Sequence, residues 1–295
     1  MKRFFLIGSL LLTSLFANAQ DFQKRFLDLS SKNDTTALAS LLKDWEAKSP
    51  KDPELYIAYF NYYVKKSAAE TISLDKDQKG PESLAISDST GREVGYLNNQ
   101  VMYLSENVER GIEQINRGIA LHPNRLDMRF GKIYILGETG DYKAFTNSII
   151  EAIEYGNKIN NQWLWKEGKP LENESESFLS SIQGYVGTLY NTEDDALLPY
   201  MRQISETVLK YQPKHVESLS NVALTYMIVQ EYDKAIPYLL KAEEAAPRDI
   251  VVLNNLAETY KRKNDVKAAK AYFEKVIKYG NKEEARDAKV RLKKL

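Results

Sequence analysis

Residues 216–249 read VESLSNVALTYMIVQEYDKAIPYLLKAEEAAPRD, and residues 250–283 read IVVLNNLAETYKRKNDVKAAKAYFEKVIKYGNKE. The two stretches have equal length and carry similar residue types at matching places. A fixed spacing of 34 residues over this many positions indicates a tandem structural repeat. The matched pairs are Leu219 with Leu253, Val222 with Leu256, Ala223 with Ala257, Tyr226 with Tyr260, Ala235 with Ala269, Leu239 with Phe273, and Ala242 with Val276.

The spacing within each repeat predicts two helices. The first four matched positions follow at steps of three, one and three residues, which places them on one face of a helix. The last three follow at steps of four and three, which indicates a second helix. Small residues such as Ala223 and Ala235 allow two antiparallel helices to approach closely. A hairpin this short cannot bury its apolar faces alone, so we expect stacked hairpins with a shared core.

At these residues the chain resembles the tetratricopeptide repeat family. Hairpins of that family carry a large apolar residue, then Leu, Gly or Ala, and Tyr on the first helix, and Ala, an aromatic residue and Ala on the second, with Pro after it. Pro247 takes the terminal proline place in the first repeat, and Gly280 with Asn281 stands there in the second. The resemblance implies an all-α, right-handed α-solenoid of antiparallel helix hairpins that binds a protein or peptide partner in its concave groove.

Signals that end helices extend the pattern toward the N-terminus. Pro213 lies 34 residues before Pro247, and the string Tyr155-Gly156-Asn157-Lys158 recurs as Tyr279-Gly280-Asn281-Lys282. We interpret these strings as ends of second helices, with Gly in the left-handed conformation. About six hairpins result: a degenerate hairpin at 21–49, a hairpin with an insertion at 53–123, repeats at 124–157, 175–215, 216–249 and 250–282, a linker at 158–174 and a capping helix at 283–295.

The insertion carries two different patterns. Leu97, Val101, Leu104 and Val108 are spaced three or four residues apart, which predicts one long helix from about residue 93 to residue 121. Upstream, residues 66–92 carry apolar clusters on both sides of Gly80-Pro81. This pattern predicts an inserted loop or small hairpin.

The N-terminus predicts export. Lys2 and Arg3, an uncharged stretch over residues 4–16, and Ala17-Asn18-Ala19 form the three regions of a signal peptide, so we expect removal of residues 1–19. An uncleaved anchor is the alternative, but the apolar run is shorter than the roughly 18 residues of a spanning helix. The chain has no Cys, which excludes the ordinary lipoprotein route. We therefore expect a periplasmic or secreted protein with no stable membrane insertion after cleavage.

Charge and composition disfavour nucleic acid as a partner and disfavour catalysis. Removal of residues 1–19 leaves 39 basic and 41 acidic residues, and the dense basic run over 286–294 is interpreted as a solvated helix end. The two histidines, His122 and His215, are too far apart in sequence to form a helical pair of metal ligands. The sequence has neither a Cys nucleophile nor a glycine-rich phosphate loop. We expect no enzyme activity, no metal and no cofactor.

Two groups of residues are candidates for partner binding. The resemblance implies that an Asn near the middle of each first helix bonds the backbone of an extended peptide, and Asn221 and Asn255 match that position. The alternative is that Asn is simply common there. Other residues expected to face the groove are Asn254, Glu258, Lys261 and Arg262.

Trp163 and Trp165, in the linker at 158–174, form the second group. Two tryptophans in a loop are able to form an exposed platform for a sugar ring or an apolar side chain, whereas the alternative is that they cover a seam of the solenoid. The sequence thus favours a non-catalytic scaffold of the cell envelope that binds a protein or peptide. A glycan-binding or glycan-processing accessory protein that uses this linker is the second reading, and an enzyme is the third.

Overall fold

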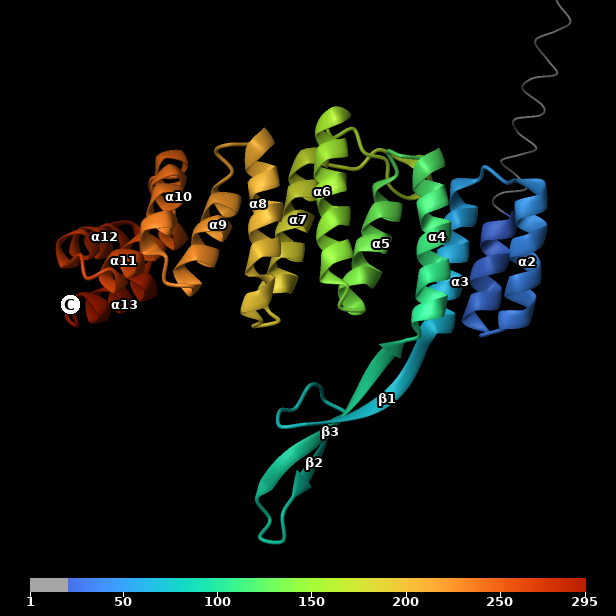
Figure 1. The fold of residues 1–295 in the computed structure, drawn as a ribbon, viewed down its shortest axis with the longest axis horizontal. Coiled ribbons are helices and arrows are strands. Elements are labelled where there is room, and N and C mark those ends of the chain that lie inside the picture. The colour runs from blue at the N-terminus through green and yellow to red at the C-terminus, as the bar shows by residue number, and fades with distance from the viewer. Residues whose placement is uncertain (1–20) are drawn as a thin grey trace, which may run out of the picture. The chain divides into compact units, whose positions relative to one another are not determined.

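A computed structural model describes residues 21–295, in which stacked helices are interrupted by one three-stranded sheet (Figure 1). The signal peptide predicted over residues 1–19 lies outside the described residues. Residues 21–139 with 164–169 form one compact unit, and residues 140–163 with 170–295 form another. The predicted all-α solenoid class is confirmed, with the sheet as an addition to it. None of the helices within residues 21–295 combines the length and the apolar character needed to cross a membrane.

The helices of the first unit begin at capping residues. Asp34 accepts a hydrogen bond from the backbone of Ala37, and Asp52 precedes Pro53 in the same role for the next helix. The core places Trp45 against Phe22, with ring centroids 5.4 Å apart. The elements are a helix over residues 21–31, α2 (Thr35–Lys48), α3 (Pro53–Ser67), α4 (Ser105–Leu121), α5 (Leu126–Glu138) and the short 3-10 helix η1 (Lys166–Gly168).

The insertion between α3 and α4 is a sheet with antiparallel strands in the order β1-β3-β2. Its strands are β1 (Ala68–Asp75), β2 (Leu84–Ser87) and β3 (Glu93–Tyr103). The long helix predicted from residue 93 is therefore wrong over β3, and α4 begins only at Ser105. Its apolar spacing is ambiguous, because Leu97 and Val101 also lie on one face of a strand. Residues poor in helix propensity, such as Gly95 and Asn98, favour the strand, and so does pairing with β1 along its whole length.

The second unit contains the rest of the helices. Each hairpin joins a first helix to an antiparallel second helix through a short turn. The elements are α6 (Tyr142–Lys158), α7 (Glu174–Tyr190), the 3-10 helix η2 (Asp195–Leu197), α8 (Leu198–Tyr211), α9 (Val216–Ile228), α10 (Tyr232–Ala245), α11 (Ile250–Arg262), α12 (Val266–Tyr279) and α13 (Lys282–Leu292).

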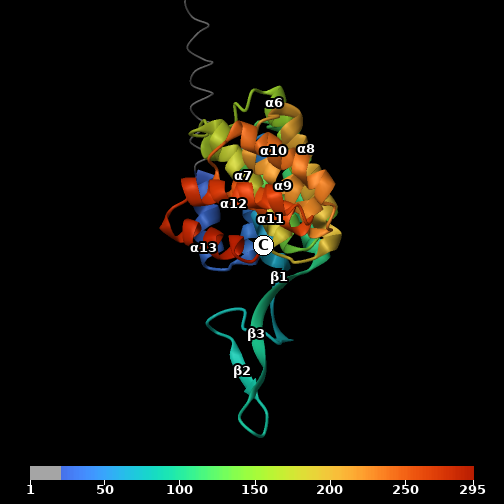
Figure 2. The same ribbon diagram turned by 90° about the vertical axis from the view of Figure 1, so that its left-hand side faces the viewer.

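The repeated positions form the core of these hairpins. All four repeated alanines, at 223, 235, 257 and 269, are fully buried, as close helix contact requires. Tyr226 stacks on Tyr238 and Tyr260 stacks on Tyr272, with ring centroids 6.1 and 5.6 Å apart. At the C-terminal end, α13 contacts α12 and buries Ala288 in the last core cluster (Figure 2).

Two glycines do not adopt the predicted left-handed conformation. Gly280 has φ −73°, and Gly156 lies inside α6, which continues to Lys158. Asn160 and Asn161, with φ 52° and 56°, make the left-handed turn after α6 instead. Gly156 is needed for space, because a Cβ there would lie 2.8 Å from Asn161 Oδ1 and 3.1 Å from the Trp163 ring.

Candidate partner-binding surface

The first helices α7, α9 and α11 are neighbours in the second unit, since α9 contacts both α7 and α11. We call the outward sides of these three helices the first-helix surface. Each helix contributes a partly exposed amide side chain near its middle: Gln183 from α7, Asn221 from α9 and Asn255 from α11. Their buried neighbours, such as Val222 and Leu256, hold the helices in place by packing into the core.

The amide of Asn221 is engaged within the protein. Its Nδ2 donates to Oε1 of Gln183 at 2.6 Å, and Nε2 of Gln183 donates to Oγ of Ser218 at 3.2 Å. The sequence analysis missed Gln183. It lies 38 residues before Asn221, the same spacing that separates Asp195 from Asp233, and this offset was the signal that would have identified it.

Helix α11 carries most of the predicted groove residues. Asn254 and Asn255 are partly exposed, and their side chains make no hydrogen bond to any other residue within 21–295. Glu258 pairs with Arg291 of α13, with 3.2 Å between Oε1 and Nη1. Lys261 and Arg262 are at least partly exposed at the end of the helix, and neither forms an ion pair with a described residue. The structure thus brings four groups with free polar atoms together on α11.

His215 anchors the start of α9. Its Nδ1 accepts from the backbone N–H of Ser218 at 3.3 Å and lies 2.9 Å from the Ser218 Oγ. Its Nε2 lies 3.3 Å from a carboxylate oxygen of Glu217. Burial lowers the pKa of His215 below its usual 6.5, and Glu217 only partly opposes that shift. The folded protein therefore favours the neutral imidazole as the helix cap.

This lowered pKa predicts a loss of stability in mild acid. The unfolded chain binds the proton more readily than the folded chain, so the free energy of unfolding should fall as the pH drops below 6.5. One group contributes a slope of at most about 1.4 kcal/mol per pH unit. His215→Asn, which keeps a capping side chain without a titrating ring, should flatten this slope in urea unfolding at pH 8 and pH 5. Equal slopes in both proteins would contradict the assignment.

The two linker tryptophans lie in different environments. Trp163 is fully buried and contacts Tyr155 and Phe178, with ring centroids 5.7 and 5.6 Å away. Trp165 is partly exposed and meets Phe130 edge-on at 6.0 Å. The hypothesis of an exposed two-ring platform is therefore wrong for Trp163. Its apolar surface is already covered by α6 and α7, which is what the alternative reading of the linker predicts.

Titratable residues do not gather into a metal site in the part of the chain that the structure describes: residues 21–295 contain no group of three or more Asp, Glu or His side chains placed to share an ion. The polar groups of the first-helix surface are amides and long basic side chains. Such groups supply hydrogen bonds and charge to a bound partner.

Comparison with known proteins identifies the repeats. The Tetratricopeptide repeat pattern matches residues 216–249 and 250–279. No curated protein matches the chain. Similar solved structures include a tetratricopeptide repeat protein from Parabacteroides merdae, at 12% identity over 89% of this chain and 80% of that chain, with TM-score 0.36.

Two further structures resemble the chain to a similar degree. The C-terminal part of a TPR repeat-containing protein from Cytophaga hutchinsonii is 14% identical over 87% of this chain and 78% of that one, with TM-score 0.41. YrrB, a TPR protein with an unusual peptide-binding site, is 13% identical over 84% of this chain and 97% of that one, with TM-score 0.41.

The repeat match falls on the two hairpins α9–α10 and α11–α12, whose buried alanines and stacked tyrosines form the repeated core. The chain is a tetratricopeptide repeat protein, and the predicted resemblance is confirmed over residues 216–279. A fold of this class serves as a scaffold for interaction between proteins.

Proposed function

We propose that the protein is a non-catalytic scaffold that binds an extended segment of a protein partner along the first-helix surface. The observation that carries this proposal is the pair of partly exposed amides Asn254 and Asn255, which make no hydrogen bond within residues 21–295. An amide offers both a donor and an acceptor, as one residue of peptide backbone requires. Gln183 and Asn221 continue the row of amides over α7 and α9.

A peptide-display selection tests this proposal. Peptides selected against the purified protein should lose about fivefold in affinity when Asn255→Ala removes one hydrogen bond, a change of about 1 kcal/mol. Lys261→Ala should weaken binding similarly. Lys270→Ala changes an exposed lysine on the second helix α12 and serves as the matched control. Titration calorimetry measures all four proteins. Binding that is equally strong in both α11 variants would place the site elsewhere.

We also propose that the scaffold acts in the cell envelope or outside the cell. The support is the pattern of charged, apolar and small residues over residues 1–19. In a Gram-negative host the protein should fractionate with the periplasm or the medium, and its mature N-terminus should be Gln20. Recovery in the cytoplasm with Met1 retained would contradict export.

A further inference from the structure

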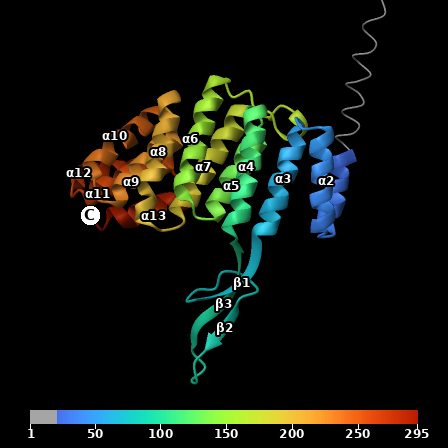
Figure 3. The same cartoon turned by 45° about the vertical axis from the view of Figure 1, so that its right-hand side comes forward.

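The strands between α3 and α4 form a projection that the repeats do not require. We call residues 68–104 the β-arm (Figures 1 and 3). It leaves the helices where α3 ends and returns where α4 begins, and the backbone N–H of Leu104 donates to the carbonyl of Ser67 at 2.8 Å. The β-arm belongs to the first unit and shares no residue with the first-helix surface.

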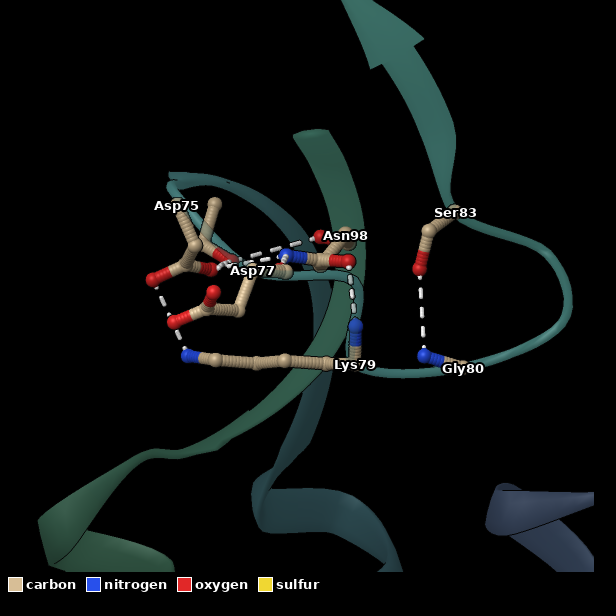
Figure 4. A network of polar contacts seen from close by, with 7 residues as sticks. Asp75, Asp77, Lys79, Gly80, Ser83 and Asn98 are labelled. Carbon is tan, nitrogen blue, oxygen red and sulfur yellow. Dashed lines mark hydrogen bonds and ion pairs between the residues drawn. The ribbon is translucent and has the colours of Figure 1, made fainter. Parts of the chain in front are cut away.

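One face of the β-arm is a satisfied polar network (Figure 4). Asn98 is 1% exposed, and its Nδ2 donates to Oδ2 of Asp75 and to the carbonyl of Asp77, both at 3.0 Å. Its Oδ1 accepts from the backbone N–H of Lys79 at 3.0 Å. Hydrogen bonds from Ser73, Asn98 and Lys79 lower the pKa of Asp75 to about 2. These contacts hold the strands and the loop after β1 in one arrangement.

The opposite face is apolar and uncovered. Leu74 and Leu84 both pair with Leu97 of the central strand, and directly paired residues point to the same face. Ile72 lies on this face two residues from Leu74, and Val101 joins it from β3. Ile72, Leu74 and Leu84 are 66%, 69% and 67% exposed. Contiguous exposed apolar side chains of this kind mark interaction sites.

The outer edge of β1 is also open. In the described sheet β1 has β3 as its only neighbour, so alternate N–H and C=O groups of its eight residues point away from the sheet. Natural edge strands are usually protected by Lys, Pro, bulges or short length. The sequence of β1, AAETISLD, has none of these features. It is therefore a template for the addition of another strand.

The charge of the β-arm selects the kind of strand. Residues 68–104 contain six acidic and three basic residues, a net charge of −3. Two of the basic residues are already paired, Lys79 with Asp75 and Arg92 with Asp88. A second copy of the β-arm would bring the same negative charge, whereas a basic segment would be attracted.

We propose that the β-arm binds an extended segment of another protein that is apolar at alternate positions and flanked by Lys or Arg. The segment adds to β1 as a strand, and its apolar side chains lie beside Ile72 and Leu74. Its flanking cations lie near the acidic residues of the β-arm, such as Glu70. This is a second binding site of the scaffold, and it does not depend on the first-helix surface.

A pair of synthetic peptides tests the proposal on the full-length protein. The first is KKVTVTVTVKK and the second is EEVTVTVTVEE, which has the same core and opposite flanks. In fluorescence anisotropy the lysine-flanked peptide should bind at least tenfold more tightly. Ile72→Lys and Leu74→Lys should each weaken it at least tenfold. Met102→Lys is the matched control, because Met102 is 58% exposed but pairs with Ala69 on the polar face. It should change the affinity less than twofold.

Two further measurements separate the outcomes. On peptide binding, hydrogen exchange should slow in residues 68–75, and Asn255→Ala should leave the affinity unchanged. Circular dichroism checks that each variant is folded, which we expect because the replaced side chains are exposed. The proposal is overturned by no binding at 1 mM peptide, by equal affinity for both peptides, or by an equal loss in Met102→Lys. Self-association that is lost in Ile72→Lys would assign the face to a second copy and would also overturn it.

Discussion

Replacing Trp163 by Ala should lower the free energy of unfolding by about 3–5 kcal/mol, the range for truncation of a large buried aromatic residue. The indole is fully buried between Tyr155 of α6 and Phe178 of α7. The surrounding backbone is fixed as well, because the N–H of Leu171 donates to the Trp163 carbonyl at 3.0 Å. The site therefore cannot collapse freely around the cavity. Urea unfolding monitored by circular dichroism measures the loss.

The neighbouring tryptophan provides the control for this experiment. Trp165 lies two residues away but is partly exposed, so Trp165→Ala should cost less than Trp163→Ala. Trp163→Phe should give an intermediate loss, because the smaller ring keeps part of the contact. A loss below about 1 kcal/mol for Trp163→Ala, typical of a surface position, would show that the linker is not part of the core.

Replacing Arg125 by Met should also cost about 3–5 kcal/mol, because it leaves buried charges without their partner. The Arg125 side chain is 3% exposed, and its Nη2 lies 2.8 Å from Oε1 of Glu54 and 2.7 Å from Oδ2 of Asp127. Its Nε also donates to Asp127 at 2.9 Å. Both carboxylates are largely buried, so water would solvate them poorly in the variant. Thermal and urea unfolding of the variant test this loss.

An exposed ion pair gives the comparison. Arg110 pairs with Glu106 one helical turn away on α4, and both side chains are more than half exposed. Arg110→Met should therefore change the stability by no more than about 0.5 kcal/mol. Arg125→Lys keeps the charge but loses the forked geometry, so its stability should lie between those of the wild type and Arg125→Met. Equal effects at positions 110 and 125 would contradict a special role for burial.

The repeats were predictable because each repeated position has one structural cause. Ala223 and Ala257 are small where helices touch, and Tyr226 and Tyr260 are large where a hairpin needs filling. The strand β3 was not predictable in the same way. Leu97 and Val101 satisfy both a helical and a strand pattern, and only pairing with β1, more than twenty residues away, decides between them.

Parts of the candidate site depend on contacts that a sequence pattern does not carry. Asn221 and Asn255 could be chosen from their spacing, but the bond from Asn221 to Gln183 depends on how α7 lies beside α9. The burial of Trp163 depends on Gly156, whose lack of a side chain makes room for the indole. The sequence analysis interpreted that glycine as a helix end, which is its commoner use.

The β-arm enters and leaves the protein at a single point, where Leu104 and Ser67 share a backbone hydrogen bond. A segment whose two ends already meet adds little closure entropy to the chain when its length changes. Evolution can therefore lengthen, shorten or replace residues 68–103 without altering the register of α3 against α4. In related chains this position would act as an exchangeable cassette, and the helices would act as a constant mount for it.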